Sequence, residues 1–120
     1  MLQYLRVVRD IMPEFFIMEN VRGLQSAKLN SVPAEYAEYE PIKDVKGSAF
    51  HFMVAEFRKL GYSISHALLN AANYGVPEKR ERIVVIGHRG ERVPIPSPTH
   101  SENGEFGTKK WNTLRSCIGD

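Results

Sequence analysis

The sequence predicts an α/β fold, because helical and strand-like patterns follow one another along the chain. Apolar residues at helical spacing run from Leu2 to Met12 and again from Ser48 to Leu60. Between these stripes lies Phe15-Phe16-Ile17-Met18, a short, wholly apolar segment that is typical of a strand. Residues 62–72 alternate in part, and residues 82–88 are β-branched and apolar, so two more strands are expected. The 120 residues allow one domain at most.

The first helix should occupy residues 2–12 and end at Pro13, which cannot continue a helix. The apolar segment Phe15 to Met18 then predicts a strand buried on both faces, as in a parallel sheet. Glu19 and Asn20 follow at once, so a carboxylate and an amide stand where this strand ends.

Residues 22–47 combine prolines, glycines and scattered charge with weak periodicity, which predicts a long excursion with short helical pieces. Ser48 is a candidate N-cap for the second helix, and Gly61 is its candidate terminator. After the strand at 62–72, the sequence Asn73-Tyr74-Gly75-Val76-Pro77 predicts a turn before the last strand. Beyond Arg89, prolines spaced by two predict an extended surface segment.

Composition excludes several classes of protein. Hydrophobic residues make up 42% and charged residues 25%, which is typical of a folded globular chain. The formal net charge of +2 does not by itself indicate a polyanionic partner. The single cysteine, Cys117, excludes an internal disulfide, and no apolar run approaches the ~20 residues of a membrane span. A cytoplasmic protein without a membrane segment is therefore expected.

Glu19 is the first candidate for chemistry, because ligands gather at the carboxyl ends of strands in open parallel sheets. The simpler interpretation is a partly solvated carboxylate that pairs with a nearby arginine. The second candidate is the run Glu78-Lys79-Arg80-Glu81-Arg82, which directly precedes the last strand. Arg80 and Arg82 alternate, so both should point the same way and offer forked donors to phosphate or carbonyl oxygens. The simpler interpretation here is a solvated, charged edge.

Several strings together resemble the cytosine-5 DNA methyltransferases. The resemblance spans nearly the whole chain and includes the family's Glu-Asn-Val and Gln-x-Arg-x-Arg motifs. The matching strings are Phe15 to Val21 with Gly23-Leu24, Leu60 to Tyr62, Leu69 to Ala71, Tyr74 to Pro77, Arg80 to Ile83, Pro98 to His100, and Trp111 to Asp120.

This resemblance implies a partial class I S-adenosylmethionine-dependent methyltransferase core, which is Rossmann-like. Residues 1–90 would form the middle and C-terminal part of the catalytic core. Residues 91–120 would form an extended segment leading into the target-recognition region. DNA is the implied partner.

The family's chemistry implies roles for five residues. A cysteine thiolate adds to C6 of a flipped-out cytosine, while an acid at N3 helps to turn C5 into a carbon nucleophile. Glu19 matches that acid, and burial at a strand end would raise the pKa of such a carboxyl. Arg82 matches the guanidinium at the cytosine O2. Arg80 would contact phosphate or base, and Asn20 and Val21 would shape the pocket.

The chain departs from the family pattern at important points. No Pro-Cys dipeptide occurs, and Cys117 does not stand at the nucleophile position. No glycine-rich loop follows a first strand, so the S-adenosylmethionine site is not expected within these residues. Glu78 replaces the usual glutamine of the arginine motif. We therefore expect a fragment or subunit that is inactive alone, that needs a complementing methyltransferase polypeptide and that tends to self-associate.

Two other functions stay open at this point: a non-catalytic interaction module or decayed remnant, and an RNA cytosine-5 methyltransferase. The four histidines lack metal-binding spacing. Trp111 beside Lys109 and Lys110 suits either DNA contact or a plain exposed edge.

Overall fold

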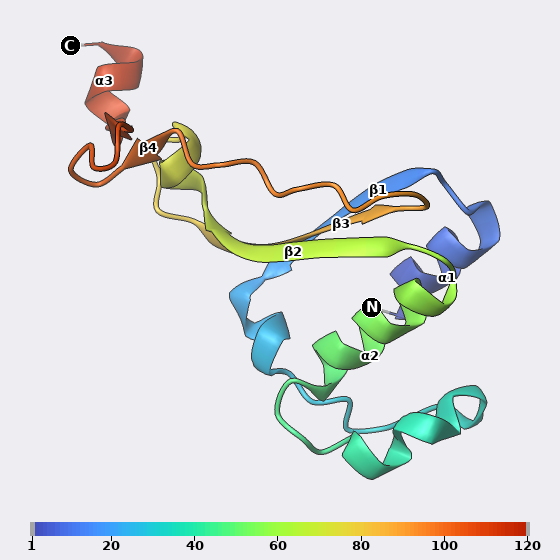
Figure 1. Cartoon of the computed structure of the whole chain (residues 1–120). Coiled ribbons are helices and arrows are strands. Elements are labelled where there is room, and N and C mark those ends of the chain that lie inside the picture. Colours follow the sequence, from blue (N-terminus) through green and yellow to red (C-terminus); the bar gives the residue numbers. More distant parts are fainter. Residues whose placement is uncertain (1, 120) are drawn as a thin grey trace.

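A computed structural model describes residues 2–119, and its mixture of helices and sheet agrees with the predicted α/β class (Figure 1). The elements in chain order are α1 (Leu2–Ile11), β1 (Phe15–Val21), the 3-10 helices η1 (Arg22–Ser26) and η2 (Ala34–Ile42), α2 (Ser48–Lys59), β2 (Ser63–Asn70), the 3-10 helix η3 (Ala71–Tyr74), β3 (Glu81–His88), β4 (His100–Ser101), β5 (Lys109–Lys110) and α3 (Leu114–Ile118).

The main sheet has the order β1-β3-β2, and β3 pairs antiparallel with both neighbours. The predicted parallel pairing of the first strand is therefore wrong for the described residues. Residues 71–80, which include η3, join β2 to β3, and this connection is shorter than the dozen or more residues that a parallel crossover needs. β1 and β2 run in the same direction, but β3 lies between them.

The first strand is buried on one face, not on both. Phe16 and Met18 are 7% and 5% exposed, whereas Phe15 and Ile17 are 53% and 68% exposed. Alternate residues of a strand point to opposite faces, and α1 and α2 cover only the face that carries Phe16 and Met18 (Figure 1). The apolar run that suggested two buried faces thus leaves half of its side chains in solvent.

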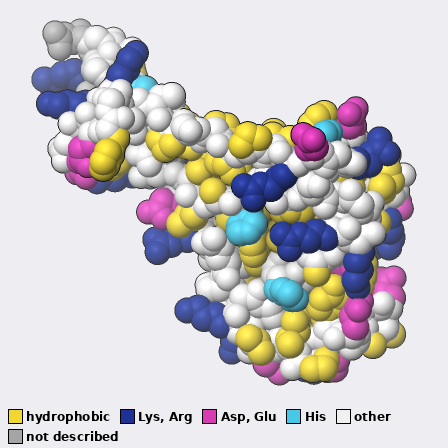
Figure 2. All heavy atoms as spheres, in the orientation of Figure 1, with side chains coloured by type: hydrophobic (Ala, Val, Ile, Leu, Met, Phe, Trp, Pro, Cys, Tyr) yellow, Lys and Arg dark blue, Asp and Glu magenta, His cyan; other side chains and the backbone are white. Residues whose placement is uncertain are grey.

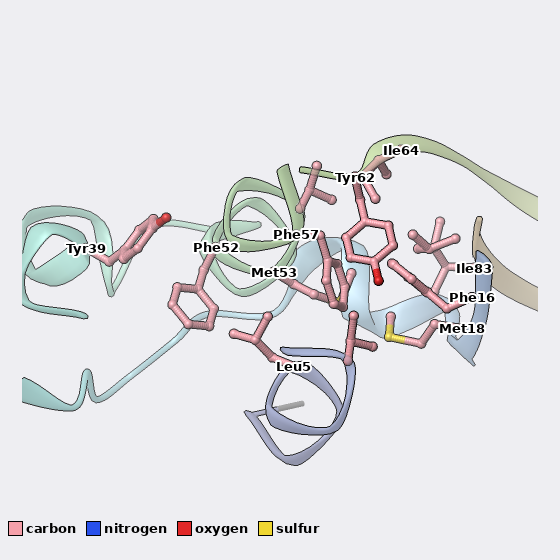
Figure 3. Close-up of a cluster of buried hydrophobic side chains, with 13 residues drawn as sticks. Leu5, Phe16, Met18, Tyr39, Phe52, Met53, Phe57, Tyr62, Ile64 and Ile83 are labelled. Carbon is pink, nitrogen blue, oxygen red and sulfur yellow. The ribbon is translucent and has the colours of Figure 1, made fainter. Parts of the chain in front are cut away.

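The core lies between this face of the sheet and the two helices (Figure 3). Phe57 from α2 stacks at a tilt on Phe16, with ring centroids 4.6 Å apart, and Tyr62 meets Phe16 edge-on at 5.0 Å. Ile83 and Val85 of β3 are fully buried beneath them. The helix stripe predicted between Leu2 and Met12 contributes Leu5 and Val8 to this core.

The second helix is capped differently from the prediction. Gly47 holds the N-cap position with φ +86°, and Ser48 is the first helical residue. The Ser48 hydroxyl accepts a hydrogen bond from the Leu29 backbone N–H at 3.0 Å and donates to the Lys43 carbonyl, also at 3.0 Å. Ser48 therefore ties the excursion to α2 instead of capping the helix. The predicted terminator Gly61 is confirmed by its φ of +98°.

The excursion at residues 22–47 contains short 3-10 helices, as predicted. Tyr39 from η2 is buried and meets Phe52 edge-on at a centroid distance of 4.8 Å. Glu38 accepts a hydrogen bond from Lys59 at the end of α2. The excursion is thus packed against the second helix.

The segment after β3 returns along the edge of β2 (Figure 1). The hydroxyls of Ser63, Ser65 and Tyr74 donate to the carbonyls of Gly90, Val93 and Pro96 respectively. Residues 99–119 then form a small C-terminal lobe with β4, β5 and α3, which extends away from the sheet. The molecule is 57 Å long, and its Cα radius of gyration of 17.4 Å exceeds the ~14 Å of a compact chain of this size. No helix among residues 2–119 has the length and hydropathy of a membrane span.

Candidate functional site

Glu19 and Arg82 contact each other on the uncovered face of the sheet. In the β1–β3 register Glu19 lies opposite Val84 and Val21 lies opposite Arg82, so the two charged residues are diagonal neighbours. The Arg82 Nε and the Glu19 Oε1 are 3.3 Å apart. The two candidates, 63 positions apart in sequence, therefore meet where β1 ends and β3 begins.

Arg82 keeps donors available for a ligand. Its Nη1 donates to the Glu81 carbonyl at 2.7 Å, and its Nε faces Glu19. A guanidinium carries five N–H donors in a planar fork, so these two contacts orient the group without saturating it. The side chain is 29% exposed, against 54% for Glu19.

The burial expected around Glu19 is not found among the described residues. Its side chain stands on the face that no helix covers and is more than half exposed. The reason is the alternation of side chains along β1. Phe16 and Met18 point to the buried face of the sheet, and Glu19 points to the opposite, uncovered face. The premise of a desolvated carboxyl is therefore wrong for this chain by itself.

A second ion pair crosses the same end of the sheet and was not anticipated. Arg22, the first residue of η1, places its Nη1 3.2 Å from the Glu81 Oε2. Glu81 thus pairs with Arg22 through its side chain while its carbonyl accepts from Arg82. The only sequence feature that draws attention to Arg22 is its position directly after Glu-Asn-Val. No periodicity in the sequence links Arg22 to Glu81.

Asn70 was also missed, and it organises the turn that delivers the arginines. Its Oδ1 accepts hydrogen bonds from the backbone N–H of Ala72 at 3.1 Å and of Arg80 at 3.2 Å. The Ala71 N–H donates to the Arg80 carbonyl at 2.9 Å. One side-chain oxygen therefore closes both ends of the loop before β3, which fixes where Arg82 leaves the turn.

The remaining predicted residues lie near this pair, and Val21 is the cross-strand partner of Arg82. The Asn20 Oδ1 accepts from the Val21 N–H at 2.7 Å, and Val21 is 54% exposed. Arg80 is exposed, and its described hydrogen bonds are those of its backbone to Asn70 and Ala71. Glu78 is exposed as well and forms no described ion pair with Arg80.

Cys117 and the histidines stand apart from the site. Cys117 is free and exposed in α3, at the far end of the C-terminal lobe from β1 (Figure 1). His88 stacks on Phe15 with centroids 4.0 Å apart, and His66 meets Phe50 edge-on at 4.9 Å. Among residues 2–119 no three His, Cys, Asp or Glu side chains are grouped as metal ligands.

A cavity of about 360 Å³ lies on the helical side of the sheet, away from the Glu19–Arg82 pair. Leu2, Leu29, Val32 and Phe52 supply its apolar walls. The ion pair instead occupies a partly exposed surface at the end of the sheet.

Comparison with known proteins shows to which family this chain belongs. The fold and the site define an α/β protein with a carboxylate and a guanidinium paired at one end of its sheet. The family description "C-5 cytosine-specific DNA methylase" matches residues 1–120. The chain belongs to this family of DNA methyltransferases.

Bacterial proteins named as Type II methyltransferases are among its relatives. Type II methyltransferase M.BsuRI of Bacillus subtilis is 34% identical over 122 residues, covering 99% of this chain and 24% of that protein. M.AquIA of Picosynechococcus is 34% identical over 130 residues, covering 98% of this chain and 47% of that protein. M1.HphI of Haemophilus parahaemolyticus is 34% identical over 118 residues, with 98% and 25% covered. The chain thus spans less than half the length of each of these relatives.

Proposed function

We propose that this chain is a fragment or subunit of a DNA (cytosine-5)-methyltransferase, in which Glu19 and Arg82 bind and activate a flipped cytosine. The supporting observation is their 3.3 Å contact at the sheet end. An acid and a guanidinium held this close can engage adjacent atoms of one pyrimidine ring: N3 and the O2 carbonyl.

The chemistry assigns a separate task to each group. When a thiolate forms a bond to C6, the C5–C6 double bond opens and electron density moves toward N3 and O2. Glu19 supplies a proton or a hydrogen bond at N3, and Arg82 stabilises the charge on O2. C5 would then carry the enamine-like electron density that methylation at this carbon requires. The Arg82–Glu19 contact holds both groups before the base enters.

Neighbouring residues complete the proposed pocket. Arg80, exposed at the start of β3, contacts a phosphate or the base. Asn20 and Val21 shape the wall beside Glu19. The Arg22–Glu81 pair and the Asn70 bridge hold the backbone from which Arg82 projects.

The methyl donor of this family is S-adenosylmethionine, which supplies the methyl group. The residues present do not fit its binding. The described strands end in Val21-Arg22, Asn70-Ala71 and His88-Arg89, and none of these ends opens into a glycine-rich loop. We assign the donor site and the Pro-Cys nucleophile to a complementing polypeptide and expect this chain to be inactive alone.

The uncovered face of β1 supports such a complement. Phe15, Ile17 and Val21 are each more than half exposed and flank Glu19 on the same face. β1 is also an edge strand, so its outer backbone groups are free to pair with another strand. Covering this face would bury Glu19 and supply the desolvation that the chain alone lacks.

The proposed division of the chain follows from this arrangement. Residues 1–90 carry the sheet, its helical cover and the candidate site, and they act as part of the catalytic core. Residues 91–120 act as the extended segment toward the target-recognition region. The extended run along β2 and the C-terminal lobe support this division.

A chimera tests the proposal. This chain replaces the matched segment of M.BsuRI, and transfer of tritium from labelled S-adenosylmethionine to DNA is measured. Glu19→Gln should lower the rate at least a hundredfold, whereas Glu14→Gln, another exposed carboxyl beside β1, should leave it within twofold. Equal labelling with Gln at position 19 would refute the role of Glu19.

The same assay separates the other candidate functions. Labelling of an RNA duplex in place of DNA would indicate an RNA methyltransferase. A chimera that folds and binds DNA but transfers no methyl group would favour a non-catalytic module or a decayed remnant.

A further inference from the structure

We propose that Lys79, Trp111, Lys109 and Lys110, here called the basic edge, form a contact surface for the phosphate backbone of double-stranded DNA. The proposal rests on the proposed function, because it names how the DNA runs beside the candidate cytosine site. The four residues come from two segments about 30 positions apart in sequence.

The fold brings these segments together through Trp111. The indole Nε1 donates to the Asn73 Oδ1 at 2.8 Å, and the Trp111 backbone N–H donates to the Ser101 carbonyl at 3.0 Å. The ring is therefore held on the turn before β3. Lys79, three residues before Arg82, places its Nζ 5.3 Å from the centroid of this ring.

The lobe is fastened to the same turn by further contacts. The Asn112 Nδ2 donates to the Gly75 carbonyl at 2.8 Å, and the Thr99 N–H donates to the Asn73 carbonyl at 2.9 Å. Gly75 has φ +97°, and a Cβ there would stand 3.2 Å from the His100 ring. The turn and the lobe are thus in close contact.

Lys109 and Lys110 continue the edge outward on β5. Both are exposed, and Lys79 is exposed too. None of the three forms an ion pair with a carboxylate among residues 2–119, whereas Lys43 and Lys59 each do. Figure 2 shows Lys and Arg side chains gathered on this lobe, with acidic side chains at its lower side.

This arrangement suits a phosphate backbone better than a protein surface. Lysines act as point charges toward phosphates and impose little geometry, which allows contact at successive positions along DNA. The Trp111 ring fixes Lys79 over its face instead of leaving that long side chain free. Because Lys79 directly precedes Arg80, the edge begins beside the candidate cytosine site and leads away from it.

The opposing charges are Glu78 on the turn and Glu102 and Glu105 on the lobe. Asn103 donates to the Glu105 carboxylate at 3.4 Å. These acids limit the number of phosphates that bind, so we infer a short contact of about three phosphates, one for each lysine of the edge.

Trp111 is the sole tryptophan of the sequence, so its fluorescence reports this edge directly. A 30-base-pair duplex is titrated into the full chain while Trp111 emission and the anisotropy of labelled DNA are recorded from 50 to 300 mM salt. We expect emission to change with the same midpoint as anisotropy. The variant Lys109→Ala/Lys110→Ala should reduce the magnitude of the salt slope by about 1.8 and weaken binding roughly eightfold per lysine at 0.1 M salt.

The matched control is Lys28→Ala/Lys46→Ala, which removes two lysines of the excursion and lowers the net charge equally. It should keep the salt slope within about 0.3 of the parent. The proposal of the basic edge would be overturned by any of three results: equal salt slopes for the two double variants, unchanged Trp111 emission during DNA binding, or no binding at all. Preferential binding of an RNA duplex would overturn the assignment of DNA as the partner. If the chimera still methylates DNA in a Glu19-dependent way, the proposed function survives such a failure.

Discussion

Gly87 lies directly opposite Phe16 in the β1–β3 register, and the Phe16 ring occupies the space where a side chain at 87 would begin. A Cβ at Gly87 would stand 2.1 Å from the nearest ring carbon. Phe16 in turn packs on Phe57 and Tyr62, so these two rings restrict the movement of the Phe16 ring. The centre of the core therefore depends on the absence of one side chain.

Gly87→Ala should lower the free energy of unfolding by about 1 to 3 kcal/mol, because overpacking forces the Phe16 ring out of its position. The midpoint of urea unfolding measures this effect. Gly23→Ala is the control, since no atom lies within 4 Å of the point that its Cβ would occupy and its φ is not positive. An unchanged midpoint for Gly87→Ala would show that the β1–β3 register differs from the one described.

Glu19→Gln and Arg82→Lys should each change the free energy of unfolding by less than ~1 kcal/mol. The pair is partly exposed, and ion pairs of this kind contribute little to stability. Thermal unfolding of the isolated chain checks this expectation. A larger loss would mean that these residues serve the fold, and any loss of methyl transfer could then not be assigned to chemistry.

Asn70→Ala should accelerate hydrogen exchange at the Ala72 and Arg80 amides and lower the free energy of unfolding by about 1 kcal/mol, as removal of a capping side chain does. Asn70→Asp keeps an acceptor oxygen and should preserve protection at both amides. Amide exchange followed by NMR distinguishes the two variants. Equal protection in both would mean that Asn70 does not close the loop.

Stability should fall in alkaline solution because burial raises the pKa of Tyr62 above its ordinary value of 10.0. Its hydroxyl donates to the Pro13 carbonyl inside the core. A raised pKa means that the folded chain holds the proton more tightly than the unfolded chain. The stabilisation is thus complete below pH 10 and is lost as the pH rises through the folded pKa.

Urea unfolding midpoints of the parent and of Tyr62→Phe, compared at pH 8 and pH 11, check this sign. The parent should lose more stability than the variant between the two values. Burial also raises the pKa of Tyr4 and Tyr74, so part of the alkaline loss should persist in Tyr62→Phe. A variant as sensitive to alkali as the parent would exclude Tyr62 as a cause.

Ile17→Lys should reduce self-association of the isolated chain. Ile17 is 68% exposed on the uncovered face of the sheet, where its apolar side chain favours burial against a second copy or a complement. Sedimentation at several concentrations measures the effect. Val45→Lys, at a 55% exposed position on the excursion, is the control and should sediment like the parent.

Much of this fold could be predicted from local patterns. The helices at Leu2–Ile11 and Ser48–Lys59, the three main strands and the turn before β3 follow from periodicity and from glycine and proline positions. Strand direction could not be predicted in this way, because an apolar run such as Phe15 to Met18 is compatible with one or two buried faces. Ser48 is a similar case. Its hydroxyl was recognised in the sequence as a hydrogen-bonding group near the start of a helix, but its partners Leu29 and Lys43 depend on the path of the excursion.

The candidate site was predictable only in part. Glu19 and Arg82 were identified from motif resemblance, and their contact depends on the pairing of β1 with β3, which no local pattern specifies. Arg22 and Asn70 were missed because their roles lie in long-range or loop-closing hydrogen bonds. The exposed Glu19 paired with Arg82 matches the simpler interpretation of a partly solvated carboxylate, whereas the one-sided burial of β1 was missed, since half-buried strands reveal their solvent side only when the sheet is assembled.

The C-terminal lobe has a practical consequence. The loop of residues 102–108 lies beyond β4, and the described side-chain hydrogen bonds between the lobe and the turn go to Asn73 and Gly75. Phe106 at its tip is 99% exposed. Extra residues or a fluorophore inserted there would leave the hydrophobic interior untouched, which makes this loop a suitable attachment point for probes and a tolerant position for length variation.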